Sequence, residues 1–222
     1  MSYPELEALR AQADLLDELV AELDEADWSR PTRCPPWSVF ELFGHLVGTI
    51  RFANSLLDEV DAEPSTDRQR WNVGTQRTEA DQESVREGTA AYIEGKTVAD
   101  LRGDWDAAKK AMPEGLDGDP NAVVGDPARR TIRRADLADR NVRELGIHTM
   151  DLGHATLRGE RITPEASAIL IDTFNGQLGE PLPPALGWDA KTYILTASGR
   201  RQLEPNERHT LGALADRFPL IR

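Results

Sequence analysis

Metal-binding chemistry in this chain has to come from its four histidines and its carboxylates, because it contains a single cysteine. Glu144 and His148 are four residues apart, so a helix would carry both side chains on one face, one turn apart. Leu, Ala and Asp residues share that face, and a partly buried carboxylate persists only when it is paired or bound to a metal. On an earlier segment with helical spacing, His45 shares its face with apolar residues and should also point inward.

These three side chains, His45, Glu144 and His148, are therefore candidate ligands of one divalent cation. Two imidazoles and one carboxylate form the ligand set of several catalytic zinc sites, in which a fourth position stays open for water or substrate. The same set accepts nickel, cobalt or ferrous iron, and zinc is the default expectation. A hydrogen-bonded core histidine and a Glu-x-x-x-His pair that arises by chance would give the same pattern, so spacing alone leaves the metal open.

Three charged neighbours on the same segment are candidates for supporting roles. Asp151 lies one turn beyond His148, where it could accept a hydrogen bond from a ligand imidazole or from a bound amine, or could simply lie on the helix surface. Arg140 lies one turn before Glu144 and is the catalytic candidate that would neutralise a substrate carboxylate, although a solvated helix charge is the favoured interpretation. Arg143 should point elsewhere and form a surface ion pair.

The remaining reactive and aromatic side chains are interpreted as structural. Cys34 has no nearby base in its Cys-Pro-Pro-Trp sequence, and we expect a packed thiol rather than a nucleophile. His154 falls off the ligand-bearing face and His209 lies in a polar segment that reads as a loop, so neither is proposed as a ligand. Trp37 and Trp71 are expected to pack in the interior or to form a wall of the site.

Helical spacing dominates the first two thirds of the chain. It predicts helices at residues 4–24, 38–61, 76–112 and 131–157, the third of them in two parts divided at Gly95. Ser38 and Glu41 match a capping box at the start of the second helix. Residues 62–75 and 113–127 have the composition of loops. Four main helices predict a bundle, in which polar sites form from side chains that project inward from facing helices.

After Gly159 the pattern changes, and we place a domain boundary near residue 160. Residues 1–160 would form the bundle, and residues 161–222 a small α+β appendage with a helix at 163–178. Residues 192–196 are predicted to form a β-strand, followed by a turn and a second short strand. Arg200 and Arg201 follow the first strand and could reach an anionic substrate, although surface positions are the default expectation.

Composition limits the partners. The chain has 39 acidic and 26 basic residues and a formal charge of −13, and a surface with that charge repels nucleic acid and anionic membranes. The first residues lack the apolar core of a signal peptide, and no later run is apolar enough to span a membrane, which predicts a cytoplasmic protein. The preference for Arg over Lys is a weak indication of a bacterial genome.

Two separated motifs resemble one protein family. The sequence at 34–39, together with Leu42 and His45-Leu46, resembles the first signature of the N-terminal domains of mycothiol-dependent maleylpyruvate isomerases, in the DinB-like superfamily. The sequence at 143–152 is similar to the second signature, and the resemblance extends over residues 5–158. It implies an up-and-down four-helix bundle that binds zinc through His45, Glu144 and His148. It also implies a low-molecular-weight thiol, typically mycothiol, whose sulfur can occupy the open position on the metal.

Three functions from different classes are consistent with these observations. The first is a metal-dependent isomerase or S-transferase that uses mycothiol as a metal-bound nucleophile on a small electrophilic substrate. The second is a thiol-independent lyase, hydrolase or cyclase that acts on a specialised metabolite. The third is a non-catalytic, DinB-like stress-response protein. The isomerases continue into a larger C-terminal domain with which residues 161–222 do not align, so the substrate stays open, as does the choice between monomer and homodimer.

Overall fold

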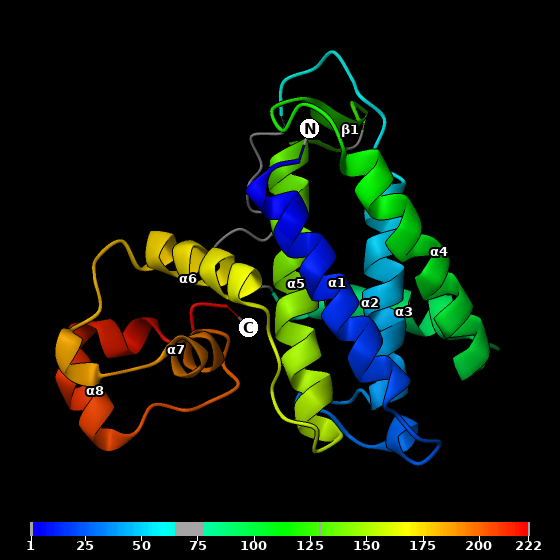
Figure 1. The fold of residues 1–222 in the computed structure, drawn as a ribbon. Helices are drawn as coiled ribbons and strands as arrows, with labels where there is room; N and C mark the ends of the chain where they lie inside the picture. The colour runs from blue at the N-terminus through cyan, green and yellow to red at the C-terminus, as the bar shows by residue number, and fades with distance from the viewer. Residues whose placement is uncertain (1, 65–77, 129, 222) are drawn as a thin grey trace.

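Helices make up most of the computed structural model, which describes residues 2–64, 78–128 and 130–221 (Figure 1). The α-helices of the first part are α1 (Pro4–Ala21), α2 (Val39–Asn54), α3 (Glu79–Ile93), α4 (Val98–Leu116) and α5 (Arg134–Ala155). A hairpin of β1 (Val123–Asp126) and β2 (Arg130–Arg133) precedes α5. The C-terminal part holds α6 (Pro164–Leu178), α7 (Ala190–Ala197) and α8 (Pro205–Leu211), with short 3₁₀ turns at Asp27–Ser29, Pro184–Leu186 and Gly212–Arg217.

The bundle core is formed by α1, α2, α4 and α5, as the spacing predicts. Helix α1 packs against α5, and α2 packs against both α4 and α5 (Figure 1). Leu9 and Leu16 of α1 are fully buried, because their spacing keeps them on one face of the helix. The capping box at the start of α2 is confirmed: the Ser38 backbone N–H donates to the Glu41 carboxylate at 2.7 Å, and the Glu41 N–H donates to the Ser38 hydroxyl at 3.3 Å.

The predicted division of the third helix at Gly95 is confirmed, because α3 ends at Ile93 and α4 begins at Val98. Gly95 has a φ of +72°, a conformation that glycine adopts without steric cost, and it ends the helical path after α3. Thr97 then caps α4 with its own capping box. Helix α3 lies outside the four-helix core and packs on α2.

The β1–β2 hairpin was not predicted. It pairs Val123 with Arg133 in antiparallel register, and the expected helix that begins at residue 131 starts instead at Arg134. Strands of only four residues, Val-Val-Gly-Asp and Arg-Thr-Ile-Arg, are too short to show a convincing alternation of apolar and polar residues, so the pattern was too weak to detect. The hairpin is held by a segment distant in sequence, because the Val60 N–H donates to the Val123 carbonyl at 3.0 Å. That segment was assigned to the second helix, which ends at Asn54.

The strand predicted at residues 192–196 is wrong, because these residues lie within α7. The side chain of Asp189 accepts a hydrogen bond from the Thr192 N–H at 2.7 Å and so caps the helix. Tyr193, Ile194 and Leu195 are all buried, and a short segment that is buried on several sides shows no helical period. The described part of residues 161–222 contains no strand, so the appendage is helical rather than α+β.

The C-terminal region packs on the bundle through a second hydrophobic cluster. Ile147 and Met150 of α5 join Phe174 of α6 and Tyr193 of α7 in this cluster. Helix α6 contacts both α1 and α5. The division at residue 160 stays a prediction. Within the described residues, no helix is both long enough and apolar enough to cross a membrane.

Candidate metal centre

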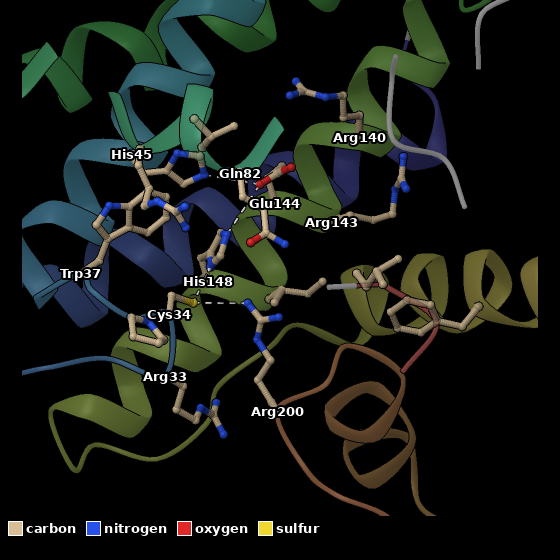
Figure 2. Close-up of a pocket in the computed structure, with 16 residues that line it drawn as sticks. Arg33, Cys34, Trp37, His45, Gln82, Arg140, Arg143, Glu144, His148 and Arg200 are labelled. Atoms are coloured by element: carbon tan, nitrogen blue, oxygen red, sulfur yellow. Dashed lines mark hydrogen bonds and ion pairs between the residues drawn. The ribbon is translucent and has the colours of Figure 1, made fainter. Parts of the chain in front are cut away.

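Side chains from α2 and α5 converge at one point on the inner side of the bundle (Figure 2). Nε2 of His45 and Nε2 of His148 each lie 3.7 Å from the same Glu144 carboxylate oxygen. The three ligand atoms all lie within 4.8 Å of one another. We call this group the ligand triad. It consists of the three side chains that the sequence selected, and the bundle brings them together from two segments far apart in the chain.

Each imidazole of the triad is oriented by a partner on its other nitrogen. Nδ1 of His148 lies 3.0 Å from the Asp151 carboxylate, and Nδ1 of His45 lies 3.4 Å from the Thr89 hydroxyl. The Trp37 ring stacks on the His45 ring with 4.7 Å between centroids. Both Nε2 atoms therefore face Glu144, so that all three side chains could bind one cation. A metal-binding imidazole typically has a hydrogen-bonding partner on its other nitrogen, as both rings do here.

Asp151 is fully buried, so a position on the helix surface is excluded. Its carboxylate lies 3.2 Å from a guanidinium nitrogen of Arg33 and 2.9 Å from one of Arg200, and it accepts a hydrogen bond from the Cys34 thiol at 3.2 Å. Burial opposes ionisation, but the hydrogen bond from His148 and the charge of Arg200 hold the pKa of Asp151 far below its usual value. A buried carboxylate is stable here because positive groups surround it.

His148 favours positive charge on its ring. Burial alone would lower its pKa, but the hydrogen bonds to Asp151 and Cys34 outweigh burial and raise the pKa to about 9. The site therefore stabilises a positive charge on the imidazole of His148.

A cavity of about 360 Å³ opens beside the triad, and His45, Glu144 and His148 form part of its wall. Trp37, Val85, Ile147, Phe174 and Ile221 supply the apolar part of the lining. The remaining charged lining is unusual for an acidic protein, because five arginines face the cavity: Arg33, Arg86, Arg140, Arg143 and Arg200. The cavity is thus suited to a small molecule with apolar and anionic parts.

Several expectations about these arginines change with the structure. Arg143 is buried, with 8% of its surface exposed, and pairs with Asp139 at 3.0 Å in the cavity wall rather than on the surface. Arg140 lines the cavity. Arg200 is not a surface residue, since it pairs with Asp151. Arg201 instead pairs with Glu207, with 2.7 Å between the two groups, and does not contact Asp151 in this arrangement.

The positions of the other candidate histidines and tryptophans agree only in part with the sequence-based expectations. His154 is half exposed and lies 3.4 Å from Glu160, so its exclusion as a ligand is consistent with the geometry. His209 is exposed on α8 rather than in a loop. Trp37 forms a wall of the cavity, and Trp71 lies outside the described residues.

A family model described as the mycothiol maleylpyruvate isomerase N-terminal domain matches residues 9–153. The chain belongs to this family. Two Mycobacterium tuberculosis proteins of the curated set, both described as uncharacterized, are 28% identical to it over 247 residues, covering 96% of this chain and 91% of each relative. The match to the family model contains both triad segments and ends at residue 153, before the C-terminal region, which contributes Arg200 to the site.

The fold of the family is also seen in two solved structures. A crystal structure of the mycothiol-dependent maleylpyruvate isomerase and one of its histidine-to-alanine mutant have TM-scores of 0.50 and 0.52 against this chain. Each shares 15% sequence identity, and each comparison covers 82% of this chain and 70% of the solved chain. The likeness confirms the mostly helical, DinB-like fold.

Cys34 lies closer to the site than its sequence context indicated. Its sulfur is 3.9 Å from Nδ1 of His148 and 3.3 Å from Arg200, so the expectation that no base lies nearby was wrong. The neighbours come from α5 and from the turn after α7, which local sequence does not reveal. Cys34, His148 and Asp151 form a second group with metal-binding spacing, but the guanidinium groups of Arg33 and Arg200 would repel a cation there. The geometry therefore favours the ligand triad.

Several residues of the site were missed in the sequence, and Arg33 and Thr89 are two that contact the triad or its partners. Arg33 immediately precedes the first signature, so its place in that motif was the available signal. Thr89 carried no signal, because a threonine on a polar helix is not distinctive until the helix is seen to pack against His45.

Proposed function

We propose that this chain is a metal-dependent enzyme that uses a low-molecular-weight thiol, mycothiol, to isomerise a small electrophilic substrate or to transfer the thiol to it. The observation that carries the proposal is the ligand triad, whose three ligand atoms lie within 4.8 Å of one another in the wall of a cavity. Membership of the mycothiol maleylpyruvate isomerase N-terminal domain family supports the thiol.

The residues present fit a divalent cation. His45 and His148 direct Nε2 toward one Glu144 oxygen, and the nitrogen on the far side of each ring has a hydrogen-bonding partner. Two imidazoles and one carboxylate suit zinc and leave a coordination position for a further ligand. When bound, zinc supplies a positive charge that favours the thiolate form of a thiol at neutral pH.

The chain's own residues would hold the reactants in place. Asp151 fixes the orientation of His148 and is itself held by Arg33 and Arg200. Arg140 and Arg143, one turn before and directly before Glu144 on α5, would bind a carboxylate of the substrate through charge-assisted hydrogen bonds.

Apolar side chains complete the reaction chamber. Trp37, Ile147 and Phe174 would cover the apolar part of the substrate and limit the access of water to the triad. Isomerisation and S-transfer both begin with the addition of a thiol sulfur to an electrophilic carbon, so one chamber serves either outcome. The reactions differ in whether the thiol is released again.

Metal content provides the first test. The protein, purified without added chelator, should contain about one zinc ion per chain by elemental analysis, and His148→Ala should lose most of that metal. His154→Ala is the matched control, because this half-exposed histidine lies on the same helix and contacts Glu160 instead. Full metal content in His148→Ala would refute the ligand assignment.

Thiol use is tested separately. Calorimetry should detect mycothiol binding to the zinc-loaded protein and much weaker binding after zinc is removed with a chelator. Turnover of maleylpyruvate, or conjugation of other electrophiles, should then require both zinc and mycothiol. Zinc-dependent turnover without any effect of mycothiol would exclude thiol chemistry and select the thiol-independent enzyme.

A further inference from the structure

Helix α3 reaches the ligand triad through one residue. Among the described residues, Thr89 is the one buried member of α3, with 6% of its surface exposed. Its hydroxyl oxygen lies 3.4 Å from Nδ1 of His45. The triad takes its side chains from α2 and α5, and the contact between Thr89 and His45 links α3 to it.

The hydroxyl of Thr89 can determine which ring nitrogen of His45 carries the proton. An imidazole that binds a cation through Nε2 carries its hydrogen on Nδ1, and that N–H needs an acceptor when it is buried. The Trp37 ring restrains the plane of the His45 ring but does not distinguish its two nitrogens. A hydroxyl oxygen beside Nδ1 does, because it can accept the Nδ1–H hydrogen bond.

Two glycines of α2 allow α3 to lie close enough for this contact. A Cβ atom at Gly44 would lie 2.3 Å from Cγ2 of Ile93, and one at Gly48 would lie 3.3 Å from Cδ1 of Tyr92. Gly44 and Gly48 are one turn apart on α2, and Ile93 and Tyr92 follow Thr89 by about one turn on α3. The glycines therefore form a seam that sets the separation of the two helices beside His45.

We propose that Thr89 is a positioning residue of the metal centre. It accepts a hydrogen bond from Nδ1–H of His45 and so keeps Nε2 directed at Glu144, at a helix separation set by Gly44 and Gly48. The inference rests on the proposed metal site and adds to it a residue, and a helix contact, that would adjust its affinity.

Zinc affinity measured by competition with a chromophoric chelator tests the role of the hydroxyl. Thr89→Val, which keeps the shape and removes the hydroxyl, should weaken zinc binding about ten-fold, the lower end of the effect seen when outer partners of metal ligands are removed. Thr89→Ser should restore affinity to within about two-fold of wild type. Thr149→Val is the matched control, since the hydroxyl of this buried threonine of α5 donates to the Leu145 carbonyl at 2.6 Å, and the zinc affinity of this variant should equal that of wild type.

The helix seam gives an independent variant if Thr89→Val folds poorly. Gly44→Ala should displace α3 and weaken zinc binding, whereas Gly88→Ala, at a site of α3 with no atom near the added methyl group, should leave the affinity unchanged. Both changes act on the same contact. The double variant Gly44→Ala with Thr89→Val should therefore bind zinc with nearly the same affinity as whichever single variant binds it less tightly. Losses that multiply in the double variant would contradict the shared contact.

The outcomes separate this inference from the proposed function. If wild type binds zinc tightly and folded Thr89→Val binds it equally well, the positioning role is wrong while the metal site stands. Weak binding in Thr89→Ser as well as in Thr89→Val would also refute it, because the hydroxyl is then irrelevant. Wild-type protein that binds no zinc would overturn both.

Discussion

Asp151 contacts several charged and polar groups of the site. One buried carboxylate lies beside an imidazole, a thiol and two guanidinium groups, from His148, Cys34, Arg33 and Arg200. These partners come from the loop before α2, from α5 and from the turn after α7. Such a group has two functions that can be separated: it orients His148, a proposed metal ligand, and it joins three parts of the chain.

Replacement of Asp151 should reveal both functions. Asp151→Asn keeps the size of the side chain and removes its charge, which leaves two partly buried guanidinium groups without their shared partner, so the free energy of unfolding should fall by about 3 kcal/mol. Zinc affinity should fall at least ten-fold, to about the extent seen for lost outer partners of metal ligands. Urea unfolding and chelator competition measure the two effects. Asp172→Asn, at an exposed position of α6, should change neither.

At the scale of elements, α5 depends on a glycine where a loop crosses it. A Cβ atom at Gly153 would lie 2.0 Å from the backbone oxygen of Gly159, which no side-chain adjustment can relieve. Gly153→Ala should therefore lower the free energy of unfolding by about 2 kcal/mol, in the range for overpacking. Gly176→Ala is the matched control, because nothing lies near the added methyl group and alanine favours helix, so it should be neutral or raise stability by up to about 1 kcal/mol. Urea unfolding of both variants decides the matter.

The carboxylate of Glu207, in the first turn of α8, makes the stability of the C-terminal region depend on pH. Hydrogen bonds from Arg201, the Glu204 backbone and Trp188 lower the pKa of Glu207 to about 2, against the opposing effect of burial. Since the folded-state pKa lies below the ordinary value of 4.5, this stabilisation is present above pH 4.5 and is lost as the pH falls toward 2.

The variant Glu207→Gln tests this dependence. Thermal unfolding should show it less stable than wild type by about 1 kcal/mol at pH 7, because charge-assisted hydrogen bonds are weakened. The difference should shrink steadily between pH 4.5 and pH 2, as wild type becomes protonated at the same site. A difference that stays constant over this range would show that the charge of Glu207 is not what matters.

The sequence predicts some helices correctly and others not, and the difference depends on how each element is buried. Helix α1 has one buried face, and the spacing of its leucines shows it directly. Helix α7 is short and largely buried, so its apolar run of Tyr193, Ile194 and Leu195 resembles a strand. The β1–β2 hairpin depends on the segment around Val60, a tertiary contact that no local pattern contains. Prediction succeeds where an element's own residues determine its burial and fails where distant residues do.

At the scale of the whole molecule, arginines gather around the cavity although the chain as a whole is acidic. The protein carries a formal charge of −13, yet five arginines line the cavity. An acidic surface disfavours large polyanions, whereas recessed guanidinium groups can still hydrogen-bond a small anion. The ligand triad was predictable because two motifs carry it, but Arg200 was not, because only the packing of the C-terminal region on α5 brings it to Asp151.

The contact between Arg200 and Asp151 should couple the stability of the bundle to that of the C-terminal region. Both regions share the hydrophobic cluster that contains Ile147 and Met150, so wild type should unfold in urea as one transition. Arg200→Met should lower the free energy of unfolding by about 2 kcal/mol, because it removes one of two guanidinium groups from a buried carboxylate.

Arg201→Met provides the neighbouring control for this coupling. Its guanidinium pairs with Glu207 and is 30% exposed, so its loss should cost about 1 kcal/mol or less and should leave zinc affinity unchanged. Equal destabilisation by the two variants, or separate transitions in wild type when fluorescence and circular dichroism are compared, would show that the bundle and the C-terminal region unfold independently. A single transition that shifts more for Arg200→Met than for Arg201→Met would show that residues beyond the family match form part of the same cooperative unit as the metal centre.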